Sequence, residues 1–342
     1  MLKGEIMPIL EVINLKKYFP VQKSLIERLV SRRVDYIKAV DGVSFVIERG
    51  EVFSLVGESG CGKTTTGRTV IRLEKPDYGR IIFDGIDISY MSEKQLRPLR
   101  RSMQIIFQDP YASLNPRMTV GDLIAHPLLI HEIMKPSEAR DEVLKMLESV
   151  GLTPPDQFYK LYPHQLSGGQ RQRVAIARAM ILKPKFIVAD EPVSMIDVSL
   201  RASILKLLLK FKSLYDLSIL FITHDLAIGR LVSNVIAVMY LGKVVEIASS
   251  DDIVENPLHP YTKALISAVP SISRVRREKL IIKGDVPNPI NPPSGCRFHP
   301  RCPFARPECS YEEPKLLELE KKHYVACHYA EELSTIKPVA EV

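Results

Sequence analysis

Short apolar runs alternate with amphipathic segments through the middle of the chain. The runs VFSLV (residues 52–56), FIVAD (186–190) and SILFIT (218–223) each have the length of a strand. Apolar residues recur at helical spacing at positions 143, 144, 147 and 150, and again at 204, 207, 208, 211 and 214. This alternation of short buried strands and helices predicts an α/β fold with a parallel sheet that helices cover on both faces.

Further elements follow from local signals. We expect strands at residues 9–13 and 43–53, a basic surface excursion over 20–38, helices over 63–73 and 171–182, and a helix from Pro136 to a stop at Gly151. The stretch VIAVMYLGKVVEIA (235–248) predicts two strands joined at Leu241 and Gly242.

The composition changes after about residue 280. Seven prolines lie between positions 287 and 307, and a stretch so rich in proline forms neither helix nor inner strand. We therefore expect two domains, 1–280 and 281–342. The second is a small proline- and cysteine-rich C-terminal module, which we expect to be held together by something other than a hydrophobic core.

Charge and hydropathy narrow the range of partners. The 342 residues carry a net charge of +7, which suits nucleic acid, an anionic membrane surface or phosphate ligands. No run of five basic residues and no RNA-binding signature occurs, so we do not expect nucleic acid as a partner. No apolar stretch reaches the roughly 18 residues of a membrane helix, and the N-terminus lacks the features of a signal peptide. We expect a cytosolic protein that meets the membrane through a partner.

A glycine-rich loop follows the first apolar run. GESGCGKT (57–64) fits the pattern G-x-x-x-x-G-K-[ST], in which backbone N–H groups turn inward around phosphate oxygens. Lys63 supplies a charge to the β- and γ-phosphates, and the Thr64 hydroxyl can ligate Mg²⁺. The residues expected to bind the nucleotide here are Gly57, Glu58, Ser59, Gly60, Cys61, Gly62, Lys63, Thr64 and Thr65.

Polar residues end three other apolar runs. Asp190 is placed to hold Mg²⁺, and Glu191 to orient or deprotonate the attacking water. Gln108 follows one apolar run and His224 ends another, at the edge where sheets of this type bind their ligands. By themselves, a single glutamine and a single histidine are no more than surface polar residues.

A second glycine-rich turn, LSGGQ (166–170), also opens a helix. Ser167, Gly168 and Gly169 place helix N–H groups where they can meet a phosphate. One nucleotide needs only one phosphate loop, so this turn needs a ligand of its own or one bound to another molecule.

The phosphate loop, Gln108, LSGGQ, VADE, SMID and His224 resemble the motifs of ABC-type ATPases in order and spacing over about residues 8–265. The resemblance implies a RecA-like core, an antiparallel β subdomain and an α-helical subdomain at about 110–165. It also implies that ATP is sandwiched between two head-to-tail ATPase domains, with LSGGQ facing the ATP of the second subunit.

The same resemblance assigns further roles. Phe19 stacks on adenine, with Tyr18 as the alternative. Gln108 senses Mg²⁺ and the γ-phosphate, so that Thr64, Gln108 and Asp190 form the Mg²⁺ set. Glu191 is the catalytic carboxylate and His224 contacts the γ-phosphate. Ser167, Gly168, Gly169 and Gln170 bind the partner's nucleotide, and Asp197 couples the two sites.

Three stretches narrow the resemblance to ATP-binding subunits of oligopeptide/dipeptide importers. They are YPHQLSGGQRQRVAIARAM, ENPLHPYTKALISAVP (255–270) and the cysteine-bearing tail. This implies a second ATPase subunit in a heterodimer or a homodimer, two membrane-spanning permeases, an extracellular binding protein reached indirectly, and a peripheral location at the cytoplasmic face of the membrane. Oligosaccharide uptake and a non-transport ABC ATPase are the alternatives.

Four of the five cysteines lie in the tail, at Cys296, Cys302, Cys309 and Cys327. Four thiolates can hold a tetrahedral Zn²⁺ or a [4Fe–4S] cluster. The spacing C-x5-C-x6-C-x17-C is wider than that of most zinc sites, and the family resemblance also favours the iron–sulfur cluster. A zinc site that includes His299, His323 or His328, disulfides, and no metal at all remain alternatives.

Overall fold

The structure is a computed structural model that describes residues 7–21, 35–268, 282 and 284–334. Its contacts divide the chain into two compact units. Unit 1 comprises Met1–Ile9, Ile47–Glu51 and Met91–Ile222, and unit 2 comprises Leu10–Val46, Val52–Tyr90 and Thr223–Val342. Within the described ranges, no helix is both long enough and apolar enough to cross a membrane.

Unit 1 contains three parallel strands, β6 (Met103–Ile106), β7 (Phe186–Asp190) and β8 (Ser218–Thr223). Every residue of β7 and β8 is buried, as expected for strands covered on both faces. The unbroken apolar runs at 186–190 and 218–223 therefore predicted both strands correctly.

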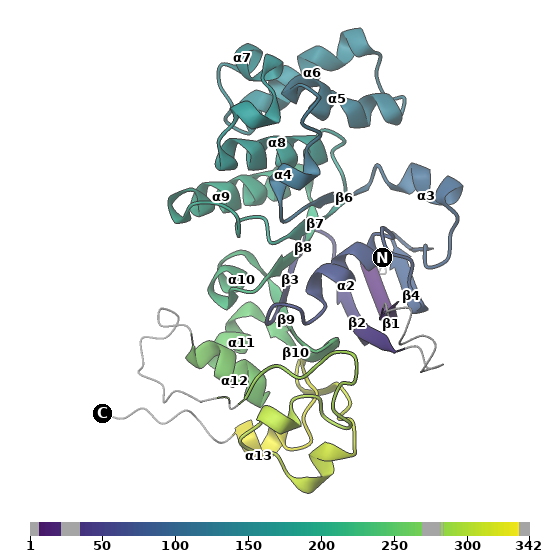
Figure 1. Cartoon of the computed structure of the whole chain (residues 1–342), viewed down its shortest axis with the longest axis vertical. Coiled ribbons are helices and arrows are strands. Elements are labelled where there is room, and N and C mark those ends of the chain that lie inside the picture. The colour runs from purple at the N-terminus through teal and green to yellow at the C-terminus, as the bar shows by residue number, and fades with distance from the viewer. Residues whose placement is uncertain (1–6, 22–34, 269–281, 283, 335–342) are drawn as a thin grey trace, which may run out of the picture. The chain divides into compact units, whose positions relative to one another are not determined.

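The described part of unit 1 also contains several helices. They are α3 (Glu93–Leu99), α4 (Pro110–Ser113), α5 (Val120–Ile130), α6 (Pro136–Ser149), α7 (Pro155–Lys160), the 3₁₀ turn η1 (Pro163–Gln165), α8 (Gly168–Met180) and α9 (Val198–Tyr215). Helices α5, α6 and α7 pack on one another, and α5 also contacts α8 (Figure 1). Helix α6 begins at Pro136 and ends before Gly151, as predicted.

Unit 2 contains two groups of strands. Strands β2 (Tyr36–Ile47), β1 (Leu10–Pro20), β4 (Tyr78–Phe83) and β5 (Ile86–Asp87) form one sheet in that order. Strands β11 (Leu317–Glu320), β12 (His323–Val325), β10 (Lys243–Ser249), β9 (Val235–Tyr240) and β3 (Val52–Val56) follow one another in the second. In this second group β3 and β9 are parallel, whereas β9 and β10 form the predicted hairpin at Leu241 and Gly242.

The helices of unit 2 are α2 (Lys63–Val70), α10 (Leu226–Val232), α11 (Ser250–Glu255), α12 (Pro260–Ser267), α13 (Ala330–Ser334) and the 3₁₀ turns η2 (His299–Arg301) and η3 (Pro307–Ser310). Phe298 from the proline-rich region is buried in the same cluster as Tyr240 and Tyr261, with ring centroids 5.3 and 5.4 Å from theirs. The expectation that this region lacks a hydrophobic core is therefore wrong, because its aromatic side chain completes the core of unit 2.

Several predicted boundaries also need correction. The strand expected over 43–53 is two strands, β2 and β3, because the chain turns at Gly50 with φ +66°. Helix α2 ends at Val70 rather than 73, and α8 begins at Gly168 rather than 171. Most of the excursion expected over 20–38 lies outside the described residues, and β1 and β2 extend into its two ends. The domain boundary near 280 also falls outside the described residues and stays a prediction.

Candidate active site

The phosphate loop of unit 2 connects β3 to α2, in the strand–loop–helix order that the motif requires. Two glycines are needed where other segments press on the loop. A Cβ at Gly57 would lie 2.1 Å from the carbonyl oxygen of Met239, and one at Gly62 would lie 2.0 Å from that of Ala39. Gly62 also has φ +106°, a left-handed value that favours glycine, and it is the N-cap of α2. This turn aims the N-terminus of α2 at the loop.

Lys63 is held inside the loop that it serves. Its ammonium donates to the carbonyl oxygens of Gly57 at 2.7 Å and Glu58 at 2.9 Å, and the residue is 4% exposed. The charge is thus already enclosed by the loop, where a phosphate would meet it. Thr64 and Thr65 follow on the first turn of α2 and are half-buried, whereas Ser59 and Gly60 are exposed. Cys61 is buried, and burial raises the pKa of its thiol, so it acts as a small filler.

Glu58 is positioned by residues that the sequence analysis did not single out. Arg301 donates to both carboxylate oxygens of Glu58, at 2.9 and 3.3 Å, and the Tyr261 hydroxyl accepts from the Glu58 N–H at 3.0 Å. No motif marks Arg301, which lies 243 residues away in the chain. The carboxylate of Glu58 is therefore bound by an arginine from the C-terminal region.

In unit 1, the acidic end of β7 brings a second group of predicted residues together. Asp190 is 1% exposed at the end of the strand. Glu191 follows with φ +44°, a left-handed backbone that is uncommon for a non-glycine residue. The Gln108 amide donates to the Glu191 carboxylate at 3.0 Å, and the Glu191 N–H donates to the Ile222 carbonyl at 2.9 Å. Gln108 and Glu191 thus form a direct pair.

The LSGGQ turn of unit 1 caps the 13-residue helix α8. The Ser167 hydroxyl accepts from the Gln170 N–H at 3.3 Å, and the Gln170 side chain accepts from the Ser167 N–H at 2.9 Å. A Cβ at Gly169 would lie 2.8 Å from Leu200, so this glycine allows α8 and α9 to pack closely, while Gly168 is half-buried. Ser167 is exposed, which suits contact with another molecule.

Three further predicted residues are described by their own surroundings. Asp197 is exposed at the N-cap of α9, and His224 is exposed directly after β8. Phe19 is half-buried in β1, with the Lys17 ammonium 5.0 Å from its ring centroid. The Tyr18 hydroxyl donates to Asp41 at 2.5 Å, so it is committed to a carboxylate within the protein. Phe19 and its alternative Tyr18 both stay predictions for the residue that stacks on adenine.

The four C-terminal cysteines line one small cavity, together with His259, His299, His328, Phe298 and Phe304. None of the four is in a disulfide. Burial and the neighbouring thiols raise the pKa of Cys296 to about 11 and that of Cys302 to about 12. His323 lies elsewhere, where its Nε2 is 2.8 Å from the Glu246 carboxylate. Over the described residues, no three or more His, Cys, Asp or Glu side chains are arranged to hold a metal ion, so the predicted metal gains no direct support.

Two family models match the chain. The model described as ABC transporter matches residues 40–194, which include the phosphate loop, LSGGQ and the acidic end of β7. The model described as oligopeptide/dipeptide transporter, C-terminal region, matches residues 245–309, which include Arg301 and three of the four cysteines. The second match begins in β10, so the C-terminal region is shared with other proteins.

Curated relatives align along most of the chain. The oligopeptide transport ATP-binding protein AppF of Bacillus subtilis (strain 168) is 48% identical over 324 residues, which is 94% of this chain and 97% of AppF. The dipeptide transport ATP-binding protein DppF of Haemophilus influenzae is 44% identical over 323 residues, again 94% and 97% of the two chains.

Among solved structures, the ATP-binding cassette MJ0796 in its dimeric post-hydrolysis state with ADP and Pi is similar, with a TM-score of 0.62 and 29% identity. The alignment covers 70% of this chain and 98% of that one. The protein cbiO1 of Clostridium perfringens, part of the ABC transporter complex cbiONQ, gives a TM-score of 0.60 at 29% identity, over 73% of this chain and 92% of the other.

Proposed function

This chain belongs to the family of ABC transporter ATP-binding proteins, and on that basis we propose that it is the ATP-hydrolysing subunit of an importer of oligopeptides or dipeptides. The observation that carries the proposal is the extent of the similarity to AppF. It covers 94% of this chain and includes the C-terminal region as well as the ATPase motifs.

In the hydrolysis mechanism that we propose, each residue takes the role that the family resemblance assigns to it. The loop N–H groups and Lys63 bind the β- and γ-phosphates of ATP. By the family resemblance, Thr64, Gln108 and Asp190 would supply hard oxygen ligands to Mg²⁺, which would neutralise charge on the phosphates. Glu191 takes a proton from the water that attacks the γ-phosphorus, while the bond to the bridging oxygen of ADP breaks. Gln108, bonded to Glu191, holds this carboxylate in place. His224 contacts the γ-phosphate.

The exposed LSGGQ turn gives a reason for a second ATPase subunit. Ser167 and the N-terminus of α8 bind the γ-phosphate of the partner's ATP, and the partner's turn does the same for the nucleotide of this chain. Asp197, on the segment that follows Glu191, couples the two sites. ATP thereby holds a head-to-tail pair together, as a heterodimer with a similar subunit or as a homodimer, and hydrolysis releases it.

The pair works beneath two membrane-spanning permeases at the cytoplasmic face of the membrane, and an extracellular binding protein delivers the peptide. The insert at about 110–165, which contains α4 to α7, lies in the chain between Gln108 and LSGGQ. We place the docking site for a permease helix on this insert. Movement at Gln108 when the γ-phosphate binds then reaches the membrane subunit.

We also propose that the four C-terminal cysteines hold a [4Fe–4S] cluster. Their thiols line a single cavity and are free of disulfides, which supports a four-thiolate ligand set. The wide spacing C-x5-C-x6-C-x17-C is why we place the cluster ahead of the zinc alternative. When bound, the cluster would tie η2, η3 and the segment after β12 together, which is a structural role.

The proposed function is tested by copurification and reconstitution. The tagged chain is purified from the membranes of its own cells together with the subunits bound to it, and the complex is placed in proteoliposomes with the binding protein. We expect the complex to copurify, and short peptides to stimulate both ATP hydrolysis and their own uptake. Stimulation by oligosaccharides but not by peptides would overturn the substrate assignment. Failure to copurify with any membrane protein would overturn the transport role.

A further inference from the structure

The segment from Cys296 to Cys302 contacts the phosphate loop of unit 2 through Arg301, and it carries one buried arginine, Arg297, and one half-buried arginine, Arg301. Arg297 is 8% exposed, and the side chain of Arg301 is 10% exposed. A guanidinium is costly to bury unless it is paired, so the partners of each arginine show what it holds in place. Neither arginine belongs to the ATPase motifs.

Arg301 forms an ion pair with Glu58 at the start of the phosphate loop. Its two terminal nitrogens donate to the two carboxylate oxygens of Glu58, a bidentate geometry that fixes direction as well as distance. Its guanidinium also lies over the Tyr240 ring and donates to the Tyr240 hydroxyl at 3.4 Å. Burial alone would lower the pKa of Arg301, but the hydrogen bonds to Glu58 and Tyr240 raise it above its ordinary value. The guanidinium therefore stays charged.

The negative charge of Glu58 is the reason why its ion pair with Arg301 would affect phosphate binding. Glu58 is the second residue of a loop that binds a polyanion, and a carboxylate there repels the phosphates. Arg301 compensates for the negative charge and directs the carboxylate toward the C-terminal region. Tyr261, which accepts from the Glu58 N–H, fixes the backbone at the same position. Glu58 is thus restrained through both its backbone and its side chain.

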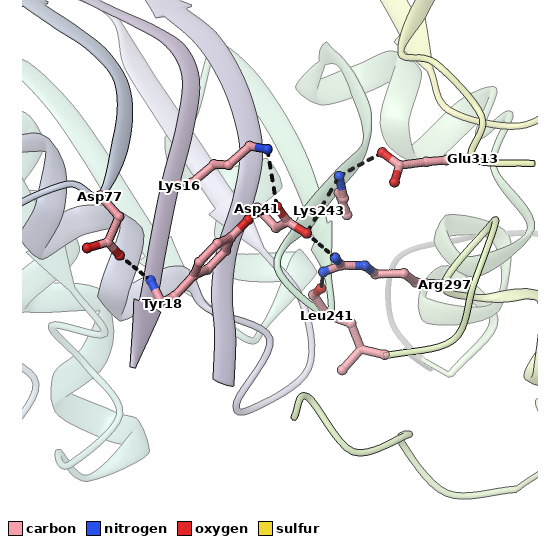
Figure 2. Close-up of polar contacts among 8 residues, drawn as sticks. All are labelled: Lys16, Tyr18, Asp41, Asp77, Leu241, Lys243, Arg297 and Glu313. Atoms are coloured by element: carbon pink, nitrogen blue, oxygen red, sulfur yellow. Dashed lines mark hydrogen bonds and ion pairs between the residues drawn. The ribbon is translucent and has the colours of Figure 1, made fainter. Parts of the chain in front are cut away.

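Arg297 supports the loop from the other end. It donates to the Leu241 carbonyl and to the Asp41 carboxylate (Figure 2). Gly242, next in the same turn, donates its N–H to the carbonyl of Cys61 at 2.8 Å. The turn on which the phosphate loop rests is therefore held by Arg297.

Asp41 links Arg297 to β1, the strand that contains the adenine-stacking candidate Phe19. Besides Arg297, it accepts from the Tyr18 hydroxyl at 2.5 Å, and the ammonium of Lys243 lies 4.0 Å away (Figure 2). Tyr18 directly precedes Phe19 in β1. The C-terminal region thereby contacts the phosphate loop directly, and it is linked through Asp41 to Tyr18, the neighbour of the adenine-stacking candidate.

We propose that Arg301 and Arg297 are positioning residues for the nucleotide, through which the C-terminal region sets the affinity of the phosphate loop for ATP. Arg301 compensates for the charge of Glu58 and orients it, and Arg297 fixes the turn behind Cys61 together with Asp41. The inference rests on the proposed function in one respect, that this loop binds ATP.

The test measures ATP and ADP binding to the full-length chain by titration calorimetry. Arg301→Gln should weaken ATP binding about tenfold, within the range that coupled sites commonly show. In the double variant Glu58→Gln/Arg301→Gln no uncompensated carboxylate remains, so affinity should return to within about threefold of the wild type. In the assembled complex, Arg301→Gln should raise the KM for ATP and leave kcat nearly unchanged.

Arg80→Gln is the matched control, because it breaks the exposed 3.0 Å pair with Asp87 in the same unit and removes the same charge. It should change ATP affinity by less than about twofold, as expected for a surface pair. Thermal unfolding of each variant shows whether it is folded, and Arg301→Lys provides a second variant that keeps the charge and should bind ATP with intermediate affinity.

The outcomes separate the inference from the proposed function. A wild-type chain that binds no ATP would overturn the proposed function. A wild type that binds ATP, with Arg301→Gln binding equally well, would overturn only the inference. A double variant as weak as Arg301→Gln would also overturn it, because the charge of Glu58 would then not be what Arg301 controls.

Discussion

The side-chain amide of Gln108 donates a hydrogen bond to the Glu191 carboxylate at 3.0 Å, across 83 residues of sequence. Gln108 lies just after β6 and Glu191 just after β7, and these two strands are parallel neighbours. The carboxyl ends of parallel strands meet at one edge of a sheet, which is why the two side chains can pair. Glu191 also has a left-handed backbone conformation, which sets the direction of its side chain. Because the two side chains are hydrogen-bonded, a shift of Gln108 would move the carboxylate of the proposed general base.

Replacing Glu191 by Gln should abolish most hydrolysis. The amide keeps the size of the side chain but cannot take a proton from water. We expect ATP turnover by the assembled complex to fall by at least ~10²-fold, with nucleotide binding retained. Phosphate release and ATP affinity, measured on the same preparation, check both parts. Unchanged turnover would exclude Glu191 as the base.

The variants Ser167→Ala and Ser92→Ala distinguish the helix-capping role of Ser167 from its proposed contact with the nucleotide of the second subunit. Ser167 and Ser92 both cap helices of unit 1 through capping boxes, Ser167 with Gln170 and Ser92 with Gln95. Each substitution by alanine should lower the free energy of unfolding by about 1 kcal/mol. Only Ser167→Ala should also reduce ATP hydrolysis by the assembled complex, because we propose that only this turn faces the nucleotide of the second subunit. Equal hydrolysis by the two variants would argue against that role for LSGGQ.

Asp41→Asn should destabilise the protein in a pH-dependent way. Burial alone would raise the pKa of Asp41, but the hydrogen bond from Tyr18 and the charges of Lys243 and Arg297 lower it below its ordinary value. Loss of the charge leaves Arg297 buried without its ion-pair partner, which should cost about 3 kcal/mol of unfolding free energy near neutral pH.

The sign of the pH effect follows from the lowered pKa. The contribution of Asp41 is complete above its unfolded pKa of about 3.9 and is lost as the pH falls through the lower folded value. Urea unfolding of wild type and variant should therefore show a constant difference above about pH 5 and a shrinking one below about pH 4. Asp87→Asn, at the exposed pair with Arg80, should cost less than about 1 kcal/mol. A difference that grows toward acid pH would contradict the assignment.

The elements that the sequence predicted correctly are those that depend on residues close together in the chain. The run at 52–56, the glycine loop after it and the helix from Lys63 all depend on neighbouring residues, and the structure contains each of them. The hairpin at Leu241 was also predictable, because Gly242 tolerates φ +79°. Gly50 is likewise a turn glycine with positive φ, and it separates the two strands that were predicted as one over 43–53.

The contacts of the C-terminal region were not predictable, because they depend on tertiary placement. Arg301 and Glu58 are 243 residues apart, and Arg297 and Asp41 are 256 residues apart. An arginine in a proline-rich segment is normally a solvated surface residue, and nothing in its neighbourhood reveals a buried partner. The burial of Phe298 beside Tyr240 and Tyr261 was missed for the same reason.

The proposed cluster predicts a colour and a metal content. Protein purified without oxygen should be brown and contain about four irons per chain, bound by the cavity-lining cysteines. Cys302→Ser should lose colour and iron, whereas Cys61→Ser should retain both, because Cys61 lies in the phosphate loop rather than in this cavity. Arg301 directly precedes Cys302, so loss of the cluster should also weaken ATP binding if the segment from 296 to 302 positions the loop. Metal analysis and the visible spectrum test the predicted iron content and colour. Colourless protein with about one zinc per chain would show that the cysteines hold zinc instead of an iron–sulfur cluster.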